Sequence, residues 1–484
     1  YFYDYSDDGS LLNNVVVEYG GQGYNANIYC YYASPSITNS LIGSSSAYGI
    51  YLSSSSPQIL GNSIRNNSQH GIYLSSSSNP TISTNTFTSN NYGIYSDAGS
   101  YPTIINNIIA TNTTALRIPA RVDIATNTIY GNTNPIIELQ GGSSYPITGN
   151  RLWKNFNHSY IILDSVYVQG SPTPTLTINP NVEVRFAQYQ SLWIGGNSSS
   201  EKGKLIANGT TGTITFTSNQ ATHTSDYWGC IYFCNYSDDE SLLNNVVVEY
   251  GGQGYNANIY CYYASPSITN SLIGSSSAYG IYLSSSSPQI LGNSIRNNNS
   301  IGIYCSSNAA SPTIGTNTFT SNNSYPIRIG ANSVDKVTNN TFSGNNPQSI
   351  CVIGDIINTS GTWTNQGVPY VIESDVYVRG AATPTLTINP GVEVRFAQYQ
   401  SLWIGGNNSS DKGKLMADGT LGTITFTSNE VTHTKGSWRC IYFYDYSDDT
   451  SLLNNVVVEY GGEGYSANIR CNSASPSITN SLIG

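Results

Sequence analysis

The sequence is poor in charge. Only 10% of its 484 residues are charged, and it has 4 histidines and 1 methionine, whereas soluble domains typically carry about 25% charged residues. The 18 Lys and Arg residues form no cluster and are outnumbered by 28 Asp and Glu, giving a net charge of −10; this argues against a nucleic-acid partner. No apolar run approaches the ~20 residues of a membrane-spanning helix, so we predict no membrane span.

The sequence also lacks the 3.6-residue apolar periodicity of helical repeats. Its apolar residues come in twos and threes, alternate with polar ones, and are interrupted by Gly, Pro, Asn and Ser. This pattern is typical of short strands separated by turns.

A short period runs through the chain. Tyr29, Tyr51, Tyr73 and Tyr95 follow one another at equal steps. A short fixed period predicts a solenoid, and three short strands in each repeat of about 22 residues fit one turn of a parallel β-helix. Strand alternation predicts inward-facing columns, which comprise Ile37, Ile59, Ile82 and Ile104 in one case and Leu41, Ile64, Phe87 and Ile109 in another.

A regular asparagine lies between these two columns. Asparagine tolerates left-handed backbone and its amide can bond turn backbone or another amide. The positions are Asn39, Asn62, Asn85, Asn107 and Asn127, and then Asn270, Asn293, Asn317 and Asn340. They resemble the asparagine ladder of right-handed parallel β-helices of the pectate-lyase-like superfamily. The resemblance implies an all-β, right-handed parallel β-helix solenoid with about 22 residues per coil.

A longer repeat overlies the coils. LLNNVVVEYGG begins at Leu11, Leu242 and Leu452, which are 231 and 210 residues apart. We predict tandem units at residues 1–150 (the end of one unit), 151–360 (a complete unit) and 361–484 (the start of a third). The leading segment TPTLTINPNVEVRFAQYQSLWIGG resembles repeat units of large microbial surface proteins. One continuous helix is the preferred arrangement, with separate beads on a string as the alternative.

The location is predicted to be extracellular. The chain begins and stops in mid-pattern, which predicts a piece of a longer array. Glycosylation sequons begin at Asn112, Asn208 and Asn358 and suit a secreted or cell-surface protein.

The tyrosines form the first candidate binding site. Tyr29, Tyr51, Tyr73 and Tyr95, with Tyr260, Tyr282 and Tyr304, are expected to form outward columns one strand spacing apart. One interpretation is a ladder that stabilises the stack through aromatic contacts. The other is an exposed strip that binds glycan, a neighbouring rod or another surface protein.

The cysteines permit two interpretations. The first is a set of buried thiols that act as small hydrophobes. The second is a repeated disulfide between Cys230 and Cys261 and between Cys440 and Cys471, since the two pairs have the same spacing and an extracellular location permits bridges.

Paired aspartates recur in YSDD turns, at Asp7–Asp8, Asp238–Asp239 and Asp448–Asp449. Such turns offer oxygen ligands for calcium, and solvated turns without a metal are the alternative. We expect no other cofactor.

Catalytic chemistry on such a fold needs titratable groups stacked on one outer face. Arg65 and Arg296 have no acidic partner in their coils, and Glu183 and Arg185, like Glu393 and Arg395, suit surface ion pairs. We therefore favour a structural rod, fibre, sheath or surface-layer element that associates end to end or laterally. A glycan-binding adhesin and a polysaccharide lyase or hydrolase are the alternatives.

Overall fold

The computed structural model describes residues 1–484 and consists almost entirely of short strands stacked in parallel coils. The predicted all-β parallel solenoid is confirmed. The chain divides into two compact units, Tyr1–Gly254 and Tyr255–Gly484. The predicted units at 1–150, 151–360 and 361–484 follow the sequence repetition instead, and they stay a prediction.

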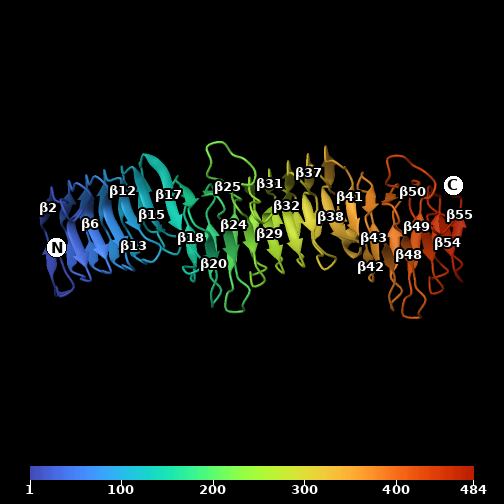
Figure 1. Ribbon diagram of the computed structural model, residues 1–484, viewed down its shortest axis with the longest axis horizontal. Coiled ribbons are helices and arrows are strands. Elements are labelled where there is room, and N and C mark those ends of the chain that lie inside the picture. Colours follow the sequence, from blue (N-terminus) through green and yellow to red (C-terminus); the bar gives the residue numbers. More distant parts are fainter. The chain divides into compact units, whose positions relative to one another are not determined.

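Unit 1 is built from strands that pair in parallel with the strand one coil away (Figure 1). Its longest sheet has the order β3 (Ala26–Tyr31), β6 (Tyr48–Ser53), β9 (His70–Ser75), β12 (Tyr92–Ser96), β15 (Thr114–Pro119), β17 (Asn134–Gln140), β19 (Ser159–Ile162), β22 (Glu183–Phe186), β25 (Ile214–Ser218) and β28 (Val246–Glu249). A second sheet has the order β1 (Leu11–Asn13), β4 (Ser36–Thr38), β7 (Gln58–Leu60), β10 (Thr81–Ser83) and β13 (Thr103–Ile105). A third contains β2 (Val16–Glu18), β5 (Leu41–Gly43), β8 (Ser63–Arg65), β11 (Thr86–Thr88), β14 (Ile108–Ala110) and β16 (Thr128–Tyr130). The later coils supply β18 (Arg151–Trp153), β21 (Thr175–Ile178), β24 (Lys204–Asn208) and β27 (Leu242–Asn244), and beside them β20 (Val166–Val168), β23 (Leu192–Ile194) and β26 (Ile231–Phe233).

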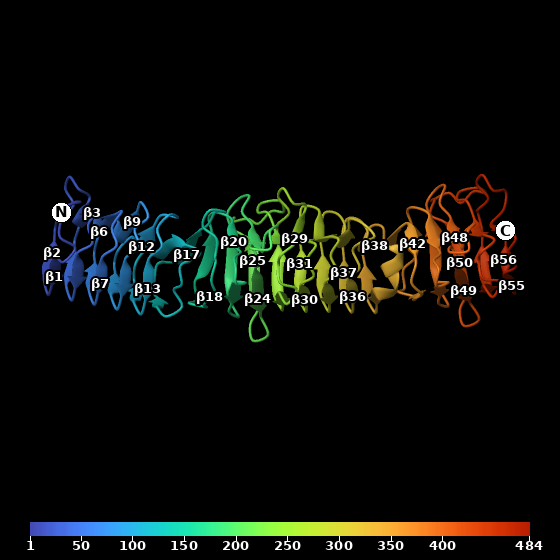
Figure 2. The ribbon, with the colours of Figure 1, turned by 90° about the horizontal axis from the view of Figure 1, so that it is seen from below.

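Unit 2 repeats this plan (Figure 2). One sheet has the order β29 (Ala257–Tyr262), β32 (Tyr279–Ser284), β35 (Ile303–Cys305), β38 (Ile327–Gly330), β41 (Ile350–Ile353), β44 (Tyr370–Ile372), β47 (Glu393–Phe396), β50 (Ile424–Ser428), β53 (Val456–Val458) and β56 (Leu482–Ile483). Its earlier coils add β30 (Ser267–Thr269), β33 (Gln289–Leu291), β36 (Thr313–Gly315) and β39 (Val337–Thr338), then β31 (Leu272–Gly274), β34 (Ser294–Arg296), β37 (Thr318–Thr320) and β40 (Thr341–Ser343). Its later coils add β42 (Asp355–Ile357), β45 (Val376–Val378), β48 (Leu402–Ile404), β51 (Ile441–Phe443) and β54 (Ile469–Cys471), then β43 (Gly361–Trp363), β46 (Thr385–Ile388), β49 (Lys414–Asp418), β52 (Leu452–Asn454) and β55 (Ser477–Thr479). A single 3-10 helix, η1, covers Ala331–Lys336.

The period predicts the strand register of the plain coils. Tyr29 pairs with Tyr51 and Tyr51 with Tyr73, each one period further along the chain. The coils lengthen in the leading segment of each repeat, where Leu192 pairs with Ile231. The longest connections project from the stack next to β25 in unit 1 and next to β50 in unit 2 (Figure 1).

The core is a set of aliphatic columns, as expected from the alternation. Ile37, Ile59, Ile82 and Ile104 are fully buried and each lies opposite the next in register. In the other column the prediction for Leu41 is wrong, because Ile42 pairs with Ile64 and is the fully buried residue.

The asparagine ladder forms, but one residue later than predicted at its first positions. Asn39 and Asn270 are exposed and adopt left-handed backbone with φ of 49°, and Ser40 and Ser271 occupy the inward position that follows. The buried ladder in unit 1 comprises Asn62, Asn85, Asn107 and Asn127, and in unit 2 it comprises Asn293, Asn317 and Asn340. The left-handed residue turns the chain so that its successor points inward, which explains the shift.

Each ladder amide serves three coils. The Asn85 side chain donates from Nδ2 to the Ile59 carbonyl at 2.8 Å and to Asn107 Oδ1 at 3.0 Å. Its Oδ1 accepts from the backbone N–H of Asn62 at 2.9 Å. These bonds satisfy backbone groups that turns otherwise leave buried and unpaired.

Two further ladders lie at the other turns of the coil and were not predicted. A second asparagine ladder comprises Asn67, Asn90, Asn112 and Asn132 in unit 1 and Asn298, Asn322 and Asn345 in unit 2. A serine ladder links Ser55, Ser78 and Ser100 through backbone N–H to Oγ bonds of 3.1 and 3.0 Å. Asn112, one of the predicted glycosylation acceptors, is thus buried, whereas Asn208 and Asn358 are exposed.

We expect Asn90→Ala to lower the free energy of unfolding by about 2–4 kcal/mol, because it leaves several buried backbone groups without partners. The neighbouring Asn91 is exposed, so Asn91→Ala is the matched control and should change stability by less than about 0.5 kcal/mol. Equilibrium denaturant unfolding measures both. Equal effects of the two substitutions would contradict the role of the ladder.

Candidate functional site

The predicted tyrosine columns are present, and each ring contacts the ring one coil away, either stacked or tilted. In unit 1 the ring centroids of Tyr29 and Tyr51 are 4.4 Å apart with an interplanar angle of 2°. The next two steps, Tyr51 to Tyr73 and Tyr73 to Tyr95, span 5.1 and 5.4 Å. All four rings are half-buried, so the column lies on the outside of the coils as expected.

Unit 2 has the same column, and both columns end in the same way. Tyr260, Tyr282 and Tyr304 are spaced by 4.5 and 5.1 Å. Arg328 lies 5.0 Å above the Tyr304 ring and forms an ion pair with Glu373 at 3.2 Å. In unit 1, Arg117 lies 5.0 Å above the Tyr95 ring and 3.7 Å from a carboxylate oxygen of Glu138.

The ring contacts determine which faces of the tyrosine rings a ligand can reach. A sugar binds an aromatic side chain through the open face of the ring. Here Tyr29 and Tyr51 cover each other's faces. The faces of Tyr73 and Tyr95 are covered by Tyr48 and His70, whose rings stack on them at 4.9 and 4.6 Å. The arrangement therefore favours a ladder that stabilises the coil stack over a platform for glycan rings.

A second aromatic column runs beside the first in unit 1 and was missed. Tyr48, His70 and Tyr92 recur at the period of the coils, and the ring of His70 stacks on that of Tyr95 at 4.6 Å and 7°. Burial lowers the pKa of His70 to about 4, which a hydrogen bond involving the Gln69 backbone opposes and the charge of Arg117 assists. The spacing of Tyr48, His70 and Tyr92 was the signal available in the sequence.

Tryptophan-containing ladders were also missed. In unit 1 the Trp193 ring lies between those of Tyr167 at 5.6 Å and Tyr232 at 4.5 Å. In unit 2, Trp403 lies 5.9 Å from Tyr377 and 5.1 Å from Tyr442. The alternating motifs VYV, LWI and IYF carried this signal.

The aspartate turns are built as capped turns. Asp238 and Asp448 each accept a hydrogen bond at 2.8 Å from the backbone N–H two residues later. Asp8 and Asp449 accept from the backbone N–H of Ser34 and Ser475 in the next coil. No group of three or more His, Cys, Asp or Glu side chains comes together as a metal site. The hydrogen bonds show that these turns cap backbone groups, and calcium binding at Asp7, Asp8, Asp238, Asp239, Asp448 and Asp449 stays a prediction.

The cysteines follow the inward columns. Cys30, Cys230, Cys261, Cys305 and Cys440 are fully buried, and burial raises the pKa of Cys30 and Cys305 to about 12. Neither predicted bridge, Cys230 to Cys261 or Cys440 to Cys471, is present. Cys471 pairs in register with Phe443 rather than with Cys440, and the offset along the strand exceeds the Cα separation of a disulfide.

The ionisable groups are used in pairs. Arg185 and Glu183 are 2.7 Å apart, as are Arg395 and Glu393, which confirms the predicted ion pairs. Arg65 and Arg296 are exposed at the ends of β8 and β34. The structure has no helix with the length and hydropathy of a membrane span.

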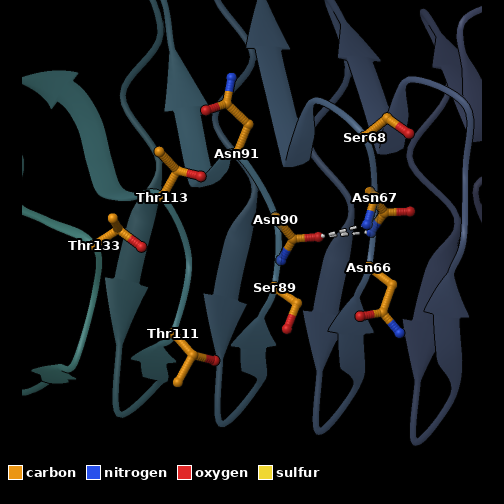
Figure 3. A pocket seen from close by; sticks show the side chains of 9 residues that line it. All are labelled: Asn66, Asn67, Ser68, Ser89, Asn90, Asn91, Thr111, Thr113 and Thr133. Atoms are coloured by element: carbon orange, nitrogen blue, oxygen red, sulfur yellow. Dashed lines mark hydrogen bonds between the residues drawn. The ribbon is translucent and has the colours of Figure 1, made fainter.

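A hollow of about 620 Å³ lies on a turn face of unit 1. Figure 3 shows its lining, which consists only of neutral side chains from successive coils: Asn66, Asn67, Ser68, Ser89, Asn90, Asn91, Thr111, Thr113 and Thr133. Asn67 and Asn90 belong to the second ladder. The hollow contains no acid or base for catalysis.

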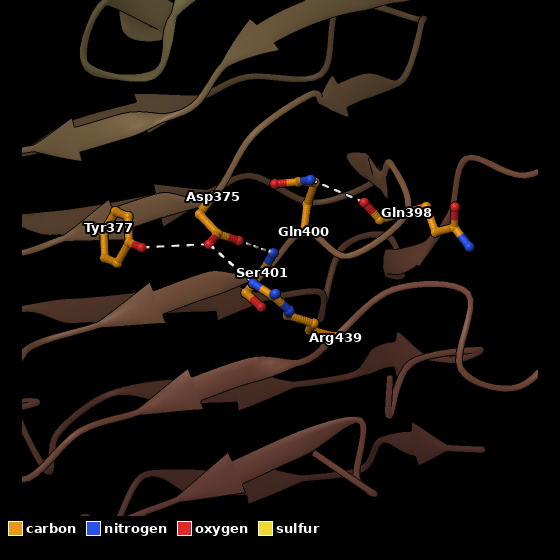
Figure 4. A network of polar contacts seen from close by, with 6 residues as sticks. All are labelled: Asp375, Tyr377, Gln398, Gln400, Ser401 and Arg439. Atoms are coloured by element: carbon orange, nitrogen blue, oxygen red, sulfur yellow. Dashed lines mark hydrogen bonds and ion pairs between the residues drawn. The ribbon is translucent and has the colours of Figure 1, made fainter. Parts of the chain in front are cut away.

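A polar network distinguishes the third repeat from the second (Figure 4). Asp375 accepts from the backbone N–H of Ser401 at 2.8 Å and forms an ion pair with Arg439 at 3.4 Å. The matching residues one repeat earlier are Ser165 and Gly229. A Cβ at Gly229 would collide with Ser191 Oγ, so the repeat that has Arg439 must arrange this serine differently. Accordingly Ser401 Oγ has no hydrogen-bond partner.

A family model described as a right-handed beta helix region matches residues 26–170 and 253–360. The match covers more than half of the chain. The chain belongs to this right-handed β-helix family. Comparison with curated proteins and with solved structures gives no significant match. The family fixes the hand of the solenoid, and it does not decide between catalytic and non-catalytic roles.

We expect unit 1 to lose stability as the pH falls from about 6.5 to about 4. The unfolded chain protonates His70 near pH 6.5, whereas the folded chain does so at a pKa of about 4. The unfolded state therefore binds the proton first, and stability decreases with decreasing pH across this window. Histidine NMR titration should find the His70 pKa near 4. His70→Tyr, which matches Tyr48 and Tyr92, should flatten this pH dependence.

The Asp375–Arg439 pair should be energetically coupled. In a double-mutant cycle with Asp375→Ser and Arg439→Gly, we expect the double variant to be about 0.5–1 kcal/mol more stable than the sum of the two single losses. The magnitude is modest because both side chains are partly exposed. Denaturant unfolding measures it, and strict additivity would show that the two substitutions are unrelated.

Proposed function

We propose that the chain is a structural repeat of a secreted or cell-surface scaffold, such as a fibre, sheath or surface layer. The observation that carries this proposal is the repetition of cohesive contacts. Amide, serine and aromatic ladders continue from coil to coil, with the amide and tyrosine ladders present in both units. Near-identical repeats provide the same contact many times along the chain. Here the repeated contacts are those that hold neighbouring coils together.

The distribution of ionisable groups supports the same role. The carboxylates of the aspartate turns cap backbone groups, and the strand carboxylates Glu183 and Glu393 pair with arginines. Enzymatic hydrolysis or elimination needs an acid and a base that face a substrate. The hollow on the turn face of unit 1 offers only amides and hydroxyls.

A glycan-binding adhesin is the second candidate. The edges of the tyrosine columns are half-exposed, and the rings follow the coil spacing. Tyr51→Ala combined with Tyr73→Ala should leave glycan-array binding unchanged if the columns are only structural. Loss of a bound glycan in this variant would favour the adhesin.

Electron microscopy of the protein isolated from its source, without refolding, tests the structural proposal. We expect extended assemblies with layering of about 4.8 Å from the stacked strands. The parallel assay is incubation of the chain with an acidic polysaccharide in the presence of calcium. Isolated particles, together with calcium-dependent cleavage, would overturn the structural proposal in favour of a lyase.

A further inference from the structure

Three arginines distinguish the third repeat from the second. Two of them lie over the rings of one aromatic cluster, and the third pairs with Asp375. The residues are Arg379, Arg439 and Arg470, where the preceding repeat has Gln169, Gly229 and Tyr260. The remaining arginine of residues 361–484, Arg395, has a counterpart in Arg185. We call this surface, with Tyr377, Trp403 and Tyr442, the arginine face.

The arginine face is held in place by its rings. Arg379 lies 4.9 Å above Tyr377, and Arg470 lies 5.4 Å from the centroids of both Tyr442 and Tyr465. Stacking of this kind orients a guanidinium and keeps its N–H groups available in the plane of the guanidinium. The face extends over successive coils, because Tyr377, Trp403, Tyr442 and Arg470 pair in register.

The positive charge of the face is only partly neutralised within the chain. Asp375 lies 3.4 Å from Arg439, and Asp411 is 4.0 Å from Arg379. Arg470 has a ring contact on each side and no ion pair. Three arginines and two carboxylates leave this face with one more positive than negative side chain, in a chain of net charge −10.

Two buried polar groups at the centre of the face lack partners. Trp403 is 5% exposed and its Nε1–H donates to no acceptor, and Ser401, just before the same strand, has an unpaired Oγ. An unpaired buried donor costs about 1–3 kcal/mol. Both atoms are shielded from solvent, so an arriving carboxylate would instead meet the exposed guanidinium of Arg470.

The chain itself has the complementary surface. The acidic turns at Asp7–Asp8, Asp238–Glu240 and Asp448–Asp449 recur once per repeat, and Asp7, Asp8, Asp239 and Asp449 are exposed. Glu240 is also exposed, but it pairs with Lys204. A hydrogen bond from Thr450 lowers the pKa of Asp448, which keeps that carboxylate ionised. Each turn is capped by its own backbone and is therefore presented in a fixed shape.

We propose that the arginine face docks an acidic turn of a second copy of this chain. The two surfaces differ, so the contact is heterologous and does not close on itself, which produces open-ended assemblies. The inference rests on the proposed structural function. It adds a specific lateral contact between neighbouring copies of the chain. Charge complementarity sets the partner and its register.

The test uses the full chain and a variant that restores the residues of the preceding repeat: Asp375→Ser, Arg379→Gln, Arg439→Gly and Arg470→Tyr. Each replacement already occurs at the matching position of the same fold, so the coils should form, and circular dichroism checks this. We expect self-association of the original chain in sedimentation velocity at low salt, weakened at least about tenfold at 1 M salt, where the Debye length is about 3 Å. The variant should remain monomeric under both conditions.

A second variant, with Asp7→Asn, Asp8→Asn, Asp238→Asn, Asp239→Asn, Glu240→Gln, Asp448→Asn and Asp449→Asn, removes the other partner surface. Alone it should also remain monomeric. Mixed with the first variant, it should form small complexes that grow no further, because the first variant has acidic turns but no arginine face and the second has a face but no acidic turns. Assembly of either variant as readily as the original chain would overturn the proposal.

Two outcomes separate this proposal from the others. If the protein from its source forms extended assemblies and the arginine variant forms them equally well, the lateral contact is overturned and the structural function stands. Binding of an acidic polysaccharide that is lost in the arginine variant, with self-association unchanged, would overturn the lateral contact and show that a glycan occupies the face instead.

Discussion

The structure depends on a hydrogen bond between a buried side-chain amide and the backbone of neighbouring coils. A coil of short strands must turn three times, and each turn removes backbone groups from the strand ladders. Asn85 and Asn90 supply the missing partners and reach the coils on both sides. Because an unpaired buried group is costly, the amide fixes where each turn lies and how each coil stacks on the next.

The scarcity of charge is compatible with this scheme. A stack held by neutral amides, hydroxyls and rings has no need of surface ion pairs, and these contribute little to stability in any case. The few charged residues then stand out by position. Arg117 and Arg328 end the tyrosine columns, and Arg379, Arg439 and Arg470 gather at one face.

Periodicity predicted most of the fold. The constant step between the tyrosines predicted the strand register of the plain coils, and the alternation predicted the buried isoleucine columns. The errors at Asn39, Asn270 and Leu41 have one origin. A sequence pattern does not reveal which turn residue takes a positive φ, and the left-handed residue decides whether its successor points inward.

The candidate site was less predictable. The tyrosine columns were expected, but their consequence depended on the tilt of each ring, which spacing alone leaves open. The second aromatic column contains His70 in a tyrosine position and so escaped a search for one residue type. The Asp375–Arg439 pair was invisible because its residues lie far apart in the sequence and only the fold brings them together.

The direction of the ladders has a mechanical consequence. The hydrogen bonds between coils run along the solenoid axis, so a pulling force along that axis loads all the bonds of a coil interface together and acts on every interface of the stack at once. A released coil of about 22 residues lengthens by up to about 70–80 Å. Because the coil interfaces are similar, the coils unfold one at a time under tension. Each unfolding event dissipates energy while the remaining coils stay folded.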